Sequence, residues 1–501
     1  MKDKDDMYAA NQEEEPLKSD EQPETIPTYR VYKRRWFILF LVTLLTDSSQ
    51  MLWLSFSPAA TAVAEYYNVS DKSINLFSMM YLLLSLPLGL VATYLLDTYS
   101  LRPSILLGAW VTAIGSIVRS ISVLPFIPTA WSFPMVCSGQ VICAMVYPIF
   151  ISCPTKVSEK WFSSNQRAFA TMVASCGFGS FIGNIMPPII IQNRGVPFLL
   201  IVYSIPPVLG ALMATFCMCS SAPPTPPSPS AAVQMQPYWI GLKQVVKNRS
   251  FLIYVAIMGI SGGLYNTFDV IAEEMLCTQG YTPTFIGLAL GLQSGIGFIG
   301  AILVSLFVDR TKLFEESLKF TQAMASVISI LMFVASFIPN MEAVILIGII
   351  LSGIFFSATY PVCVELAVET SYPVAQGTSV GLLMISMHMQ ALIFTFLLES
   401  LGRPMTSYQK VHQKCTVHSD SHAVPGSSML SLLYQAKKNA SEPQDMTVAM
   451  MVYSGLLCFQ FIALMLCFKT DYKRLNAEKL LHAEGDPSVN AEGLQNSEVT
   501  T

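Results

Sequence analysis

Charged residues are scarce in this sequence. Only 12% of its 501 residues are Asp, Glu, Lys or Arg, about half the share found in soluble globular domains. A chain of this length cannot cover a water-exposed surface with so few charges, because such surfaces are built mainly from charged residues. The small net charge of −4 gives no basic surface for a nucleic acid. These shortages exclude a soluble protein and a nucleic-acid-binding protein.

Motifs for catalysis and ATP binding are also lacking. No G-x-x-x-x-G-K-[ST] loop occurs, so we expect no ATP-driven reaction. "GLQSGIGFIG" (291–300) has the G-x-G-x-x-G spacing, but it lies in an apolar run with no preceding strand, and glycines there are typical of helix packing. The eleven cysteines are mostly scattered singly through apolar runs, as buried residues are, and indicate no disulfide framework. The sequence therefore predicts no enzyme, no cofactor and no metal site.

Long apolar runs are what the chain has in abundance. Hydrophobic residues make up 52% of it, and its mean hydropathy is +0.51. Runs long enough to cross a bilayer, about 17–25 residues, fall into two groups of six on either side of a proline-rich stretch at 221–237 that cannot hold a helix. They lie at 36–57, 75–96, 103–124, 132–153, 167–191, 198–219, 251–272, 284–308, 317–338, 342–364, 377–399 and 447–468.

These runs predict an all-α membrane protein with two six-helix halves. The residues before the first run are acidic and polar, so we expect no cleavable signal peptide. The predicted parts are a cytosolic acidic tail (1–35), the first half (36–219), a cytosolic proline-rich linker (220–250) that is extended at 221–237, the second half (251–468) with a long extracellular loop (400–446), and a cytosolic C-terminal tail (469–501).

The distribution of Lys and Arg predicts the orientation. Most of them lie in segments on the same side as the N-terminus, whereas the opposite side holds few outside the loop 400–446. Because positive residues are retained on the cytosolic side, both termini are predicted to be cytosolic. Asn68 and Asn439 then lie in extracellular sequons and are predicted glycosylation sites, whereas Asn248 faces the cytosol and should stay unmodified.

The two halves repeat each other at a nearly constant offset. Trp53 and Tyr265 are 212 residues apart, as are Asp97 and Asp309, and Tyr147 and Tyr360 are 213 apart. Internal repeats of this kind occur in the major facilitator superfamily, where the binding site lies at the membrane midplane between the halves.

One loop supports that fold. "LLDTYSLRP" (95–103) resembles the superfamily's loop between its second and third spans, with the aspartate and arginine present but Thr93 and Ser100 in place of the usual glycines. We therefore predict a twelve-span major facilitator fold with two pseudo-symmetric six-helix halves.

Longer stretches resemble one family within this superfamily. The chain is similar over nearly all of 30–470 to the feline leukaemia virus subgroup C receptor family, solute carrier family 49. The resemblance is carried by "YKRRWFILF" (32–40), "YLLLSLPLGLVATYLLDTYSLR" (81–102), "SGQVICAMVYPIFI" (138–151), "PTKVSEKWFSSNQRA" (154–168), "GLYNTF" (263–268) and "PVCVELAVETSYPVAQGTSVGLLMIS" (361–386). It implies transport of small cationic amino alcohols such as choline and ethanolamine, and haem export is also attributed to the family.

The resemblance also implies site residues. An aromatic pair that faces the ammonium group in the choline carriers matches Trp53 and Tyr265. Two glutamines of those relatives align with Tyr147 and His388, so the polar part of the site differs here. A methylated ammonium cannot donate hydrogen bonds, and an aromatic face is a favourable partner for it. The alternatives are membrane-interface aromatics for the pair and an ordinary helix contact for His388.

Asp47 and Gln50 are polar residues inside the first apolar run. Gln50 shares a helix face with Trp53, and Asp47 flanks that face. A carboxylate at mid-span costs about 2.5–3.5 kcal/mol, so we interpret Asp47 as a negative charge for a cationic substrate or as a proton site. The alternative is a structural carboxylate packed against serine hydroxyls and backbone. Arg119, late in the third run, is expected to extend outward to the membrane surface, with a role in gating as the alternative.

A cytosolic gate is predicted where the second span of each half ends. Asp97 and Arg102 are expected to hold the outward-facing state by charge pairing and helix capping, with Asp309 and Arg310 as a weaker copy.

The extracellular loop raises two further questions. Its segment His412–His422 imitates a metal site in spacing, but we expect it to stay solvated. A disulfide between Cys277 and Cys415 is left open.

We predict facilitated transport of a small cationic amine such as choline or ethanolamine by alternating access. One alternative is export of haem, which needs a large apolar cavity and axial ligands. Another is a receptor or scaffold with little transport. Coupling to protons or sodium is left open. The expected partners are a small solute and the lipid bilayer. The expected state is a monomer in the plasma membrane, with an endosomal or lysosomal membrane as the alternative.

Overall fold

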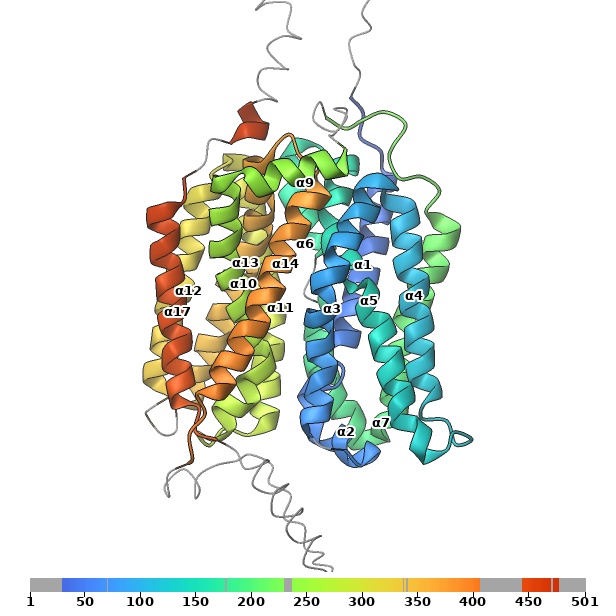
Figure 1. The fold of residues 1–501 in the computed structure, drawn as a ribbon, viewed down its shortest axis with the longest axis vertical. Coiled ribbons are helices and arrows are strands. Elements are labelled where there is room, and N and C mark those ends of the chain that lie inside the picture. The colour runs from blue at the N-terminus through green and yellow to red at the C-terminus, as the bar shows by residue number, and fades with distance from the viewer. Residues whose placement is uncertain are drawn as a thin grey trace, which may run out of the picture.

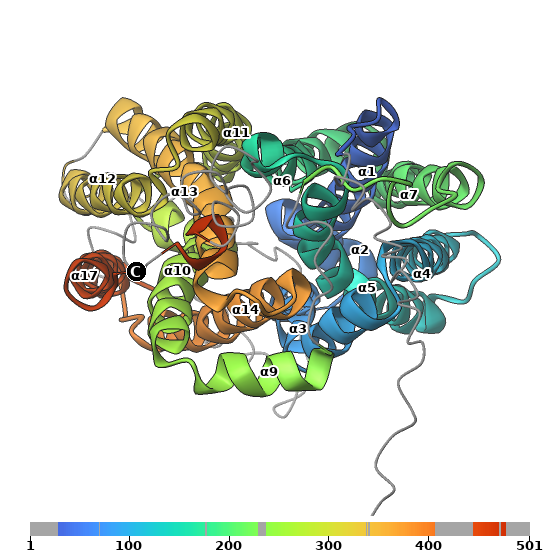
Figure 2. The same ribbon diagram turned by 90° about the horizontal axis from the view of Figure 1, so that it is seen from above.

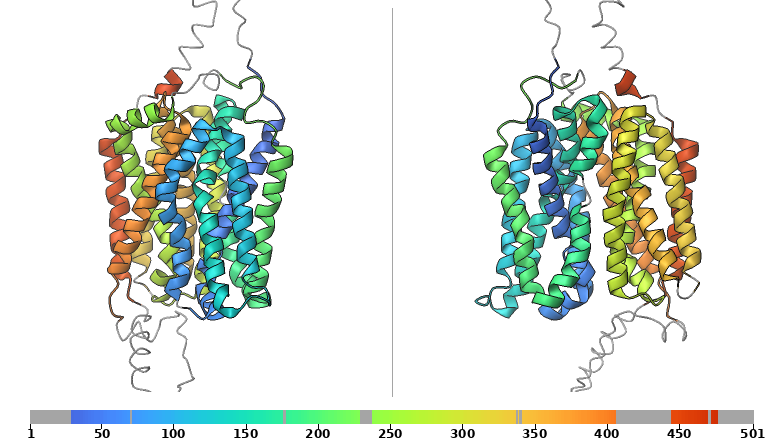
Figure 3. Two further views of the ribbon diagram at one scale, coloured as in Figure 1. Left: turned by 45° about the vertical axis from the view of Figure 1, so that its right-hand side comes forward. Right: turned by 180° about the vertical axis from the view of Figure 1, so that it is seen from behind.

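A computed structural model describes residues 29–69, 71–175, 178–228, 237–336, 338, 341–405, 444–469 and 472–476. Within these ranges the regular structure is helical, apart from one isolated antiparallel bridge between Arg403 and Asp445. Two helical bundles stand side by side, one blue to green and the other green to red, as Figures 1 and 3 show.

Each bundle corresponds to one half of the sequence. The first contains α1 (Arg34–Leu54), α2 (Ala60–Tyr67), α3 (Asp71–Thr98), α4 (Leu101–Ile121), α5 (Thr129–Trp161), α6 (Arg167–Ala174) and α7 (Phe178–Cys217). The second contains α10 (Arg249–Cys277), α11 (Pro283–Thr311), α12 (Phe314–Ala335), α13 (Glu342–Ser371), α14 (Gln376–Ser400) and α17 (Thr447–Cys467).

Twelve membrane crossings follow from eleven apolar helical segments. In the described residues, eleven segments are long and apolar enough to span a bilayer, and one of them, Arg167–Cys217, is 51 residues long. At about 1.5 Å per residue it would exceed twice the thickness of the hydrocarbon core, about 30 Å. Gly195 breaks it with a φ of 80°, a left-handed conformation that glycine adopts without steric cost. This segment therefore crosses twice, where the two runs at 167–191 and 198–219 are predicted.

The linker contains a helix that the sequence analysis did not predict. After Pro237, α9 (Tyr238–Lys247) buries Tyr238, Gly241 and Val245, which recur at helical spacing and form one apolar face. The Tyr238 hydroxyl donates to the Leu90 carbonyl oxygen at 3.1 Å and bonds the Thr93 hydroxyl at 3.1 Å. The last part of the linker is thus a docked helix (Figure 2), which begins directly after the stretch 221–237 for which an extended connector was expected.

Small residues allow the two halves to approach closely. A Cβ atom on Gly295 of α11 would lie 2.7 Å from the Phe181 ring of α7, and one on Gly291 would overlap Ile185. Both glycines therefore pack between the halves, as their helical spacing indicated. Gly287, one turn earlier, faces open space. The other main contact between the halves joins α3 to α14.

Candidate functional site

A cavity of about 190 Å³ lies between the halves, lined by residues of α1, α5, α6, α7, α10, α11, α13 and α14. His388 marks its depth, since it lies twelve residues from either end of α14, or about 18 Å along the helix. The site is therefore near the middle of the membrane and is shared by both halves.

Aromatic rings form much of the cavity wall. Trp53, Tyr147, Tyr265 and Tyr360 all line it, and they are two of the three residue pairs that recur between the halves. The centroids of the Trp53 and Tyr147 rings are 5.8 Å apart, and the Trp53 indole N–H donates to the Ser78 carbonyl oxygen at 3.1 Å. This bond and the ring contact hold the indole in one orientation toward the cavity.

The aromatic wall continues across the second half. The Tyr265 and Phe356 rings lie 5.1 Å apart, and Phe298 completes this side of the cavity. Aromatic faces therefore surround the space from both halves, which suits a quaternary or primary ammonium group.

The predicted polar residues differ in where they lie. Gln50 lines the cavity and its side-chain oxygen accepts a hydrogen bond from the Ser180 hydroxyl at 2.5 Å. His388 also lines it and stacks on Tyr147 with 6.1 Å between ring centroids. Five of the six predicted binding residues, namely Gln50, Trp53, Tyr147, Tyr265 and His388, thus surround one space.

Asp47 is the sixth predicted binding residue and does not line the cavity. Its Oδ1 atom accepts a hydrogen bond from the Gly179 backbone N–H at 3.0 Å. A Cβ atom at position 179 would overlap the Asp47 backbone, so α1 and α7 are in close contact there. This geometry matches the structural alternative, in which the carboxylate ties two helices together.

Asp269 is a cavity carboxylate that the sequence analysis missed. It lines the cavity one helical turn after Tyr265, and the Gln293 side-chain amide donates to its Oδ1 atom at 3.4 Å. The signal was present, because Asp269 is the single acidic residue in the apolar run 251–272. No Lys or Arg is among the described residues that line the cavity. Among the described lining residues, the carboxyl group of Asp269 therefore has no fixed positive partner.

The predicted gate residue Asp97 connects the two halves at the end of the bundle that is predicted to face the cytosol. Its Oδ2 atom accepts hydrogen bonds from the backbone N–H and the hydroxyl of Thr378, at 2.8 and 2.7 Å. Thr378 lies in the first turn of α14, where backbone N–H groups lack helical partners and favour a negative charge. The cation paired with Asp97 is Lys156, at 3.0 Å, whereas Arg102, the predicted partner, is exposed.

Asp309 makes the corresponding contact in the opposite direction. It accepts hydrogen bonds from the backbone N–H groups of Ala168 and Phe169, at 3.2 and 2.9 Å. Both groups belong to the first turn of α6, in the other half. Arg310 is exposed, and the nearby cation is Lys312, 4.0 Å away. Each repeat-related aspartate therefore caps a helix of the opposite half.

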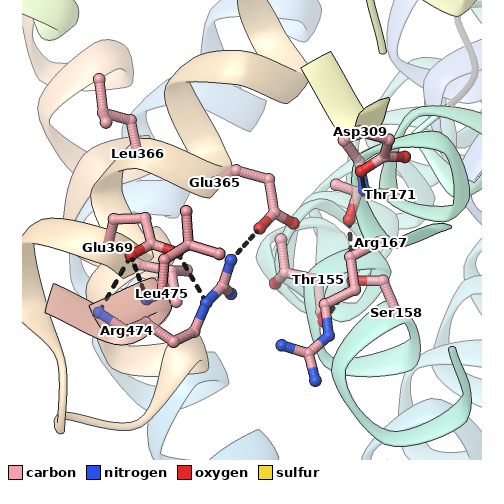
Figure 4. A network of polar contacts seen from close by, with 12 residues as sticks. Thr155, Ser158, Arg167, Thr171, Asp309, Glu365, Leu366, Glu369, Arg474 and Leu475 are labelled. Carbon is pink, nitrogen blue, oxygen red and sulfur yellow. Dashed lines mark hydrogen bonds and ion pairs between the residues drawn. The ribbon is translucent and has the colours of Figure 1, made fainter. Parts of the chain in front are cut away.

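A short C-terminal strap, residues 472–476, packs against the same end of the second half. Arg474 is 4% exposed and lies between two glutamates of α13, with 2.8 Å to a carboxylate oxygen of Glu365 and 2.8 Å to one of Glu369. Figure 4 shows this cluster beside Asp309 and the first turns of α6. The strap thus inserts one arginine into a buried acidic pair.

We expect Arg474→Ala to lower the thermal stability of the purified protein. Removing one partner of a buried ion pair costs about 3–5 kcal/mol, because Glu365 and Glu369 would lose their shared cation. The apparent Tm in detergent measures the effect. Lys473→Ala is the matched control, since Lys473 is an exposed neighbour and its loss should leave the Tm unchanged. Equal melting of the two variants would show that the strap does not stabilise the bundle.

Arg119 does not lie where it was predicted to lie. It is 1% exposed and donates to the Ser55 hydroxyl at 2.5 Å, and its guanidinium lies 4.7 Å from the centroid of the Phe56 ring. The end of α1 offers this side chain a hydroxyl, a carbonyl and an aromatic face inside the first bundle. The prediction that Arg119 extends outward was therefore wrong.

Several predicted sites lie elsewhere or outside the described residues. Asn68 is exposed and ends α2 in a left-handed conformation with a φ of 53°, at the end of the bundle opposite α9 (Figure 1). Asn439, Cys415 and His412–His422 fall outside the described residues.

Comparisons with known proteins agree with this architecture. Residues 37–395 match the Major Facilitator Superfamily. The solute carrier family 49 member A3 of Xenopus tropicalis is 34% identical over 459 residues, which cover 90% of each chain. The choline/ethanolamine transporter FLVCR2 of Homo sapiens is 26% identical over 404 residues, covering 77% of this chain and 75% of that protein.

A solved structure shares the fold. The crystal structure of a bacterial homologue of the iron transporter ferroportin, in its outward-facing state, aligns with a TM-score of 0.59 at 14% identity, covering 87% of this chain and 99% of that one. The predicted all-helical membrane fold with twelve spans in two halves is confirmed.

Proposed function

Because the chain belongs to the major facilitator superfamily and, within it, to solute carrier family 49, we propose that it transports a small organic cation such as choline or ethanolamine by alternating access. The observation that carries the proposal is the cavity itself. Aromatic faces from both halves surround it, and Asp269 lines it without a Lys or Arg among the described lining residues. This combination attracts a positive charge and disfavours an anion.

The size of the cavity supports the same class of solute. Its volume of about 190 Å³ is somewhat above that of an engineered 150 Å³ protein cavity that binds benzene. Choline and ethanolamine are solutes of that scale. A porphyrin is several times larger and carries carboxylates, so haem fits the cavity poorly. His388 is also the one histidine among the described lining residues, which leaves haem without a pair of axial ligands.

Alternating access is supported by the contacts that close the cytosolic end. Asp97 and Asp309 bind backbone N–H groups of the opposite half, and such contacts can be exchanged for water when the halves rock. We place the protein in the plasma membrane as a monomer, as the sequence analysis predicts.

Uptake of radiolabelled choline and ethanolamine by cells that express the full chain tests the proposal. We expect saturable uptake that unlabelled choline inhibits. The matched competitor is 3,3-dimethylbutanol, which has the shape of choline without its charge and should inhibit weakly. Absence of uptake of both cations, with the protein present at the cell surface by biotinylation, would refute the proposal.

A further inference from the structure

Asp269 lies where a transported cation must pass. It belongs to the membrane-spanning helix α10, one turn beyond the cavity aromatic Tyr265, and both side chains line the cavity. The hydrogen bond described for its carboxylate is a long one, 3.4 Å from the neutral Gln293 amide. A carboxylate inside a bilayer is unfavourable by about 2.5–3.5 kcal/mol at the helix centre. A bound cation removes that cost, and so does a bound proton.

The groups around Asp269 offer no other compensating charge. The cavity around it is lined by Tyr265 and Asn266 of its own helix, by Ser294 of α11, and by Phe356 and Ser357 of α13. From α11, the Gln293 amide donates to its carboxylate. Tyr453 of α17 lies with Tyr265 and Gln293 around an adjoining small cavity. Across the main cavity, α14 contributes His388. Phenols and amides are neutral at physiological pH, so the other ionisable groups among the described lining residues are the His388 imidazole and the Cys363 thiol.

We propose that Asp269 is the anionic half of the binding site and exchanges a proton for the substrate cation. The proposal rests on the proposed function. When the cation leaves, the Asp269 carboxylate takes one proton from water and forms a neutral carboxylic acid. When a cation enters, the O–H bond breaks, the proton returns to water and the carboxylate pairs with the ammonium group. One cation thus moves in exchange for one proton.

The proposed exchange predicts the direction in which the affinity for the cation changes with pH. Lowering the pH protonates Asp269, so the affinity for the cation falls as the pH falls. By linkage, the slope approaches a tenfold change in Kd for each pH unit below the titration of the carboxyl group. A protonated His388 would also repel the cation, so its contribution must be separated from that of Asp269 by mutation.

The test is binding of radiolabelled choline to the purified full chain between about pH 5.5 and pH 8.5 at constant ionic strength. We expect the wild type to bind at least ten times more weakly at the acidic end. Asp269→Asn should bind weakly at every pH and show no pH dependence, whereas Asp269→Glu should retain the dependence. Retention by His388→Gln would assign the dependence to Asp269.

Asp47→Asn is the matched control, because it removes a second intramembrane carboxylate that does not line the cavity. It should keep the pH dependence of the wild type. In proteoliposomes, an acidic interior should drive accumulation of choline by the wild type, and this driven accumulation should be lost in Asp269→Asn. The melting profile of each variant verifies that it is folded.

Different results overturn different claims. Choline binding with the same affinity at all pH values, or a pH dependence that persists in Asp269→Asn, would refute the exchange and leave the proposed function intact. Failure of the wild type to bind choline at any pH would refute both.

Discussion

Replacing Gly381 with valine is expected to abolish transport while the protein still reaches the membrane. Gly381 lies near the start of α14, at the end that is predicted to face the cytosol, and a Cβ atom there would overlap the Thr93 side chain of α3. Since α3 and α14 form a main contact between the halves, added bulk at this point separates their cytosolic ends. We expect uptake to fall at least tenfold, because the transporter cannot return to the state that is closed to the cytosol.

A native cysteine reports the open state. Cys363 lines the cavity and is 1% exposed, and it lies toward the C-terminal end of α13, which is predicted to face the cytosol. In inside-out vesicles, a membrane-impermeant thiol reagent should label Cys363 faster in Gly381→Val than in the wild type, as mass spectrometry of that peptide measures. Gly287→Val is the matched control, since no atom lies within 4 Å of a Cβ built there. Loss of uptake without faster labelling would contradict this explanation.

Replacing Trp53 with alanine is expected to have the second large effect. Trp53 is 5% exposed and contributes the largest ring of the cavity wall. A desolvated cation–π contact contributes about 2 kcal/mol or more, equivalent to roughly a 30-fold change in Kd at 25 °C. We therefore expect choline binding to weaken by about that factor, and Trp53→Phe, which keeps a ring, to weaken it less.

The control for this prediction addresses the alternative that Trp53 only anchors the protein in the membrane. Trp131 is 67% exposed and lies near the start of α5, as an interfacial aromatic does. Trp131→Ala should leave choline affinity unchanged. If the two variants weaken binding equally, or if Trp53→Ala binds choline normally, the aromatic site is wrong.

The membrane spans could be predicted because hydropathy is a local property of the sequence. The run at 167–191 and the next at 198–219 were separated correctly, although α7 continues from one run into the next and only Gly195 has non-helical backbone angles within it. By contrast, α9 escaped notice, because its short apolar face becomes informative only when α3 and α14 are placed beneath it. Long apolar segments can be recognised from the sequence alone, whereas a short helix that docks on the surface can be recognised only from its tertiary contacts.

The candidate site was predicted in part for a similar reason. The internal repeat identified Trp53, Tyr265, Tyr147 and Tyr360, and all four line one cavity. The charged partners were harder to predict, since Asp97 pairs with Lys156 from another helix and not with the nearby Arg102. The sequence also does not show toward which neighbour a single carboxylate on an apolar helix points. Asp47, which contacts α7, was therefore predicted as a binding residue, and Asp269, which lines the cavity, was not.

Asp97 and Asp309 each cap a helix of the opposite half, and this reciprocal arrangement has a consequence for the origin of the molecule. Asp97 of the first half binds the start of α14 in the second, and Asp309 of the second half binds the start of α6 in the first. Because the two aspartates are equivalent in the repeat, one ancestral residue could have made both contacts in a symmetric pair of identical six-span chains, as isologous dimers do. Fusion of two gene copies would then have released each contact to change separately. The two contacts now differ as such a history predicts. Asp97 pairs closely with a lysine, whereas Asp309 is held mainly by backbone N–H groups.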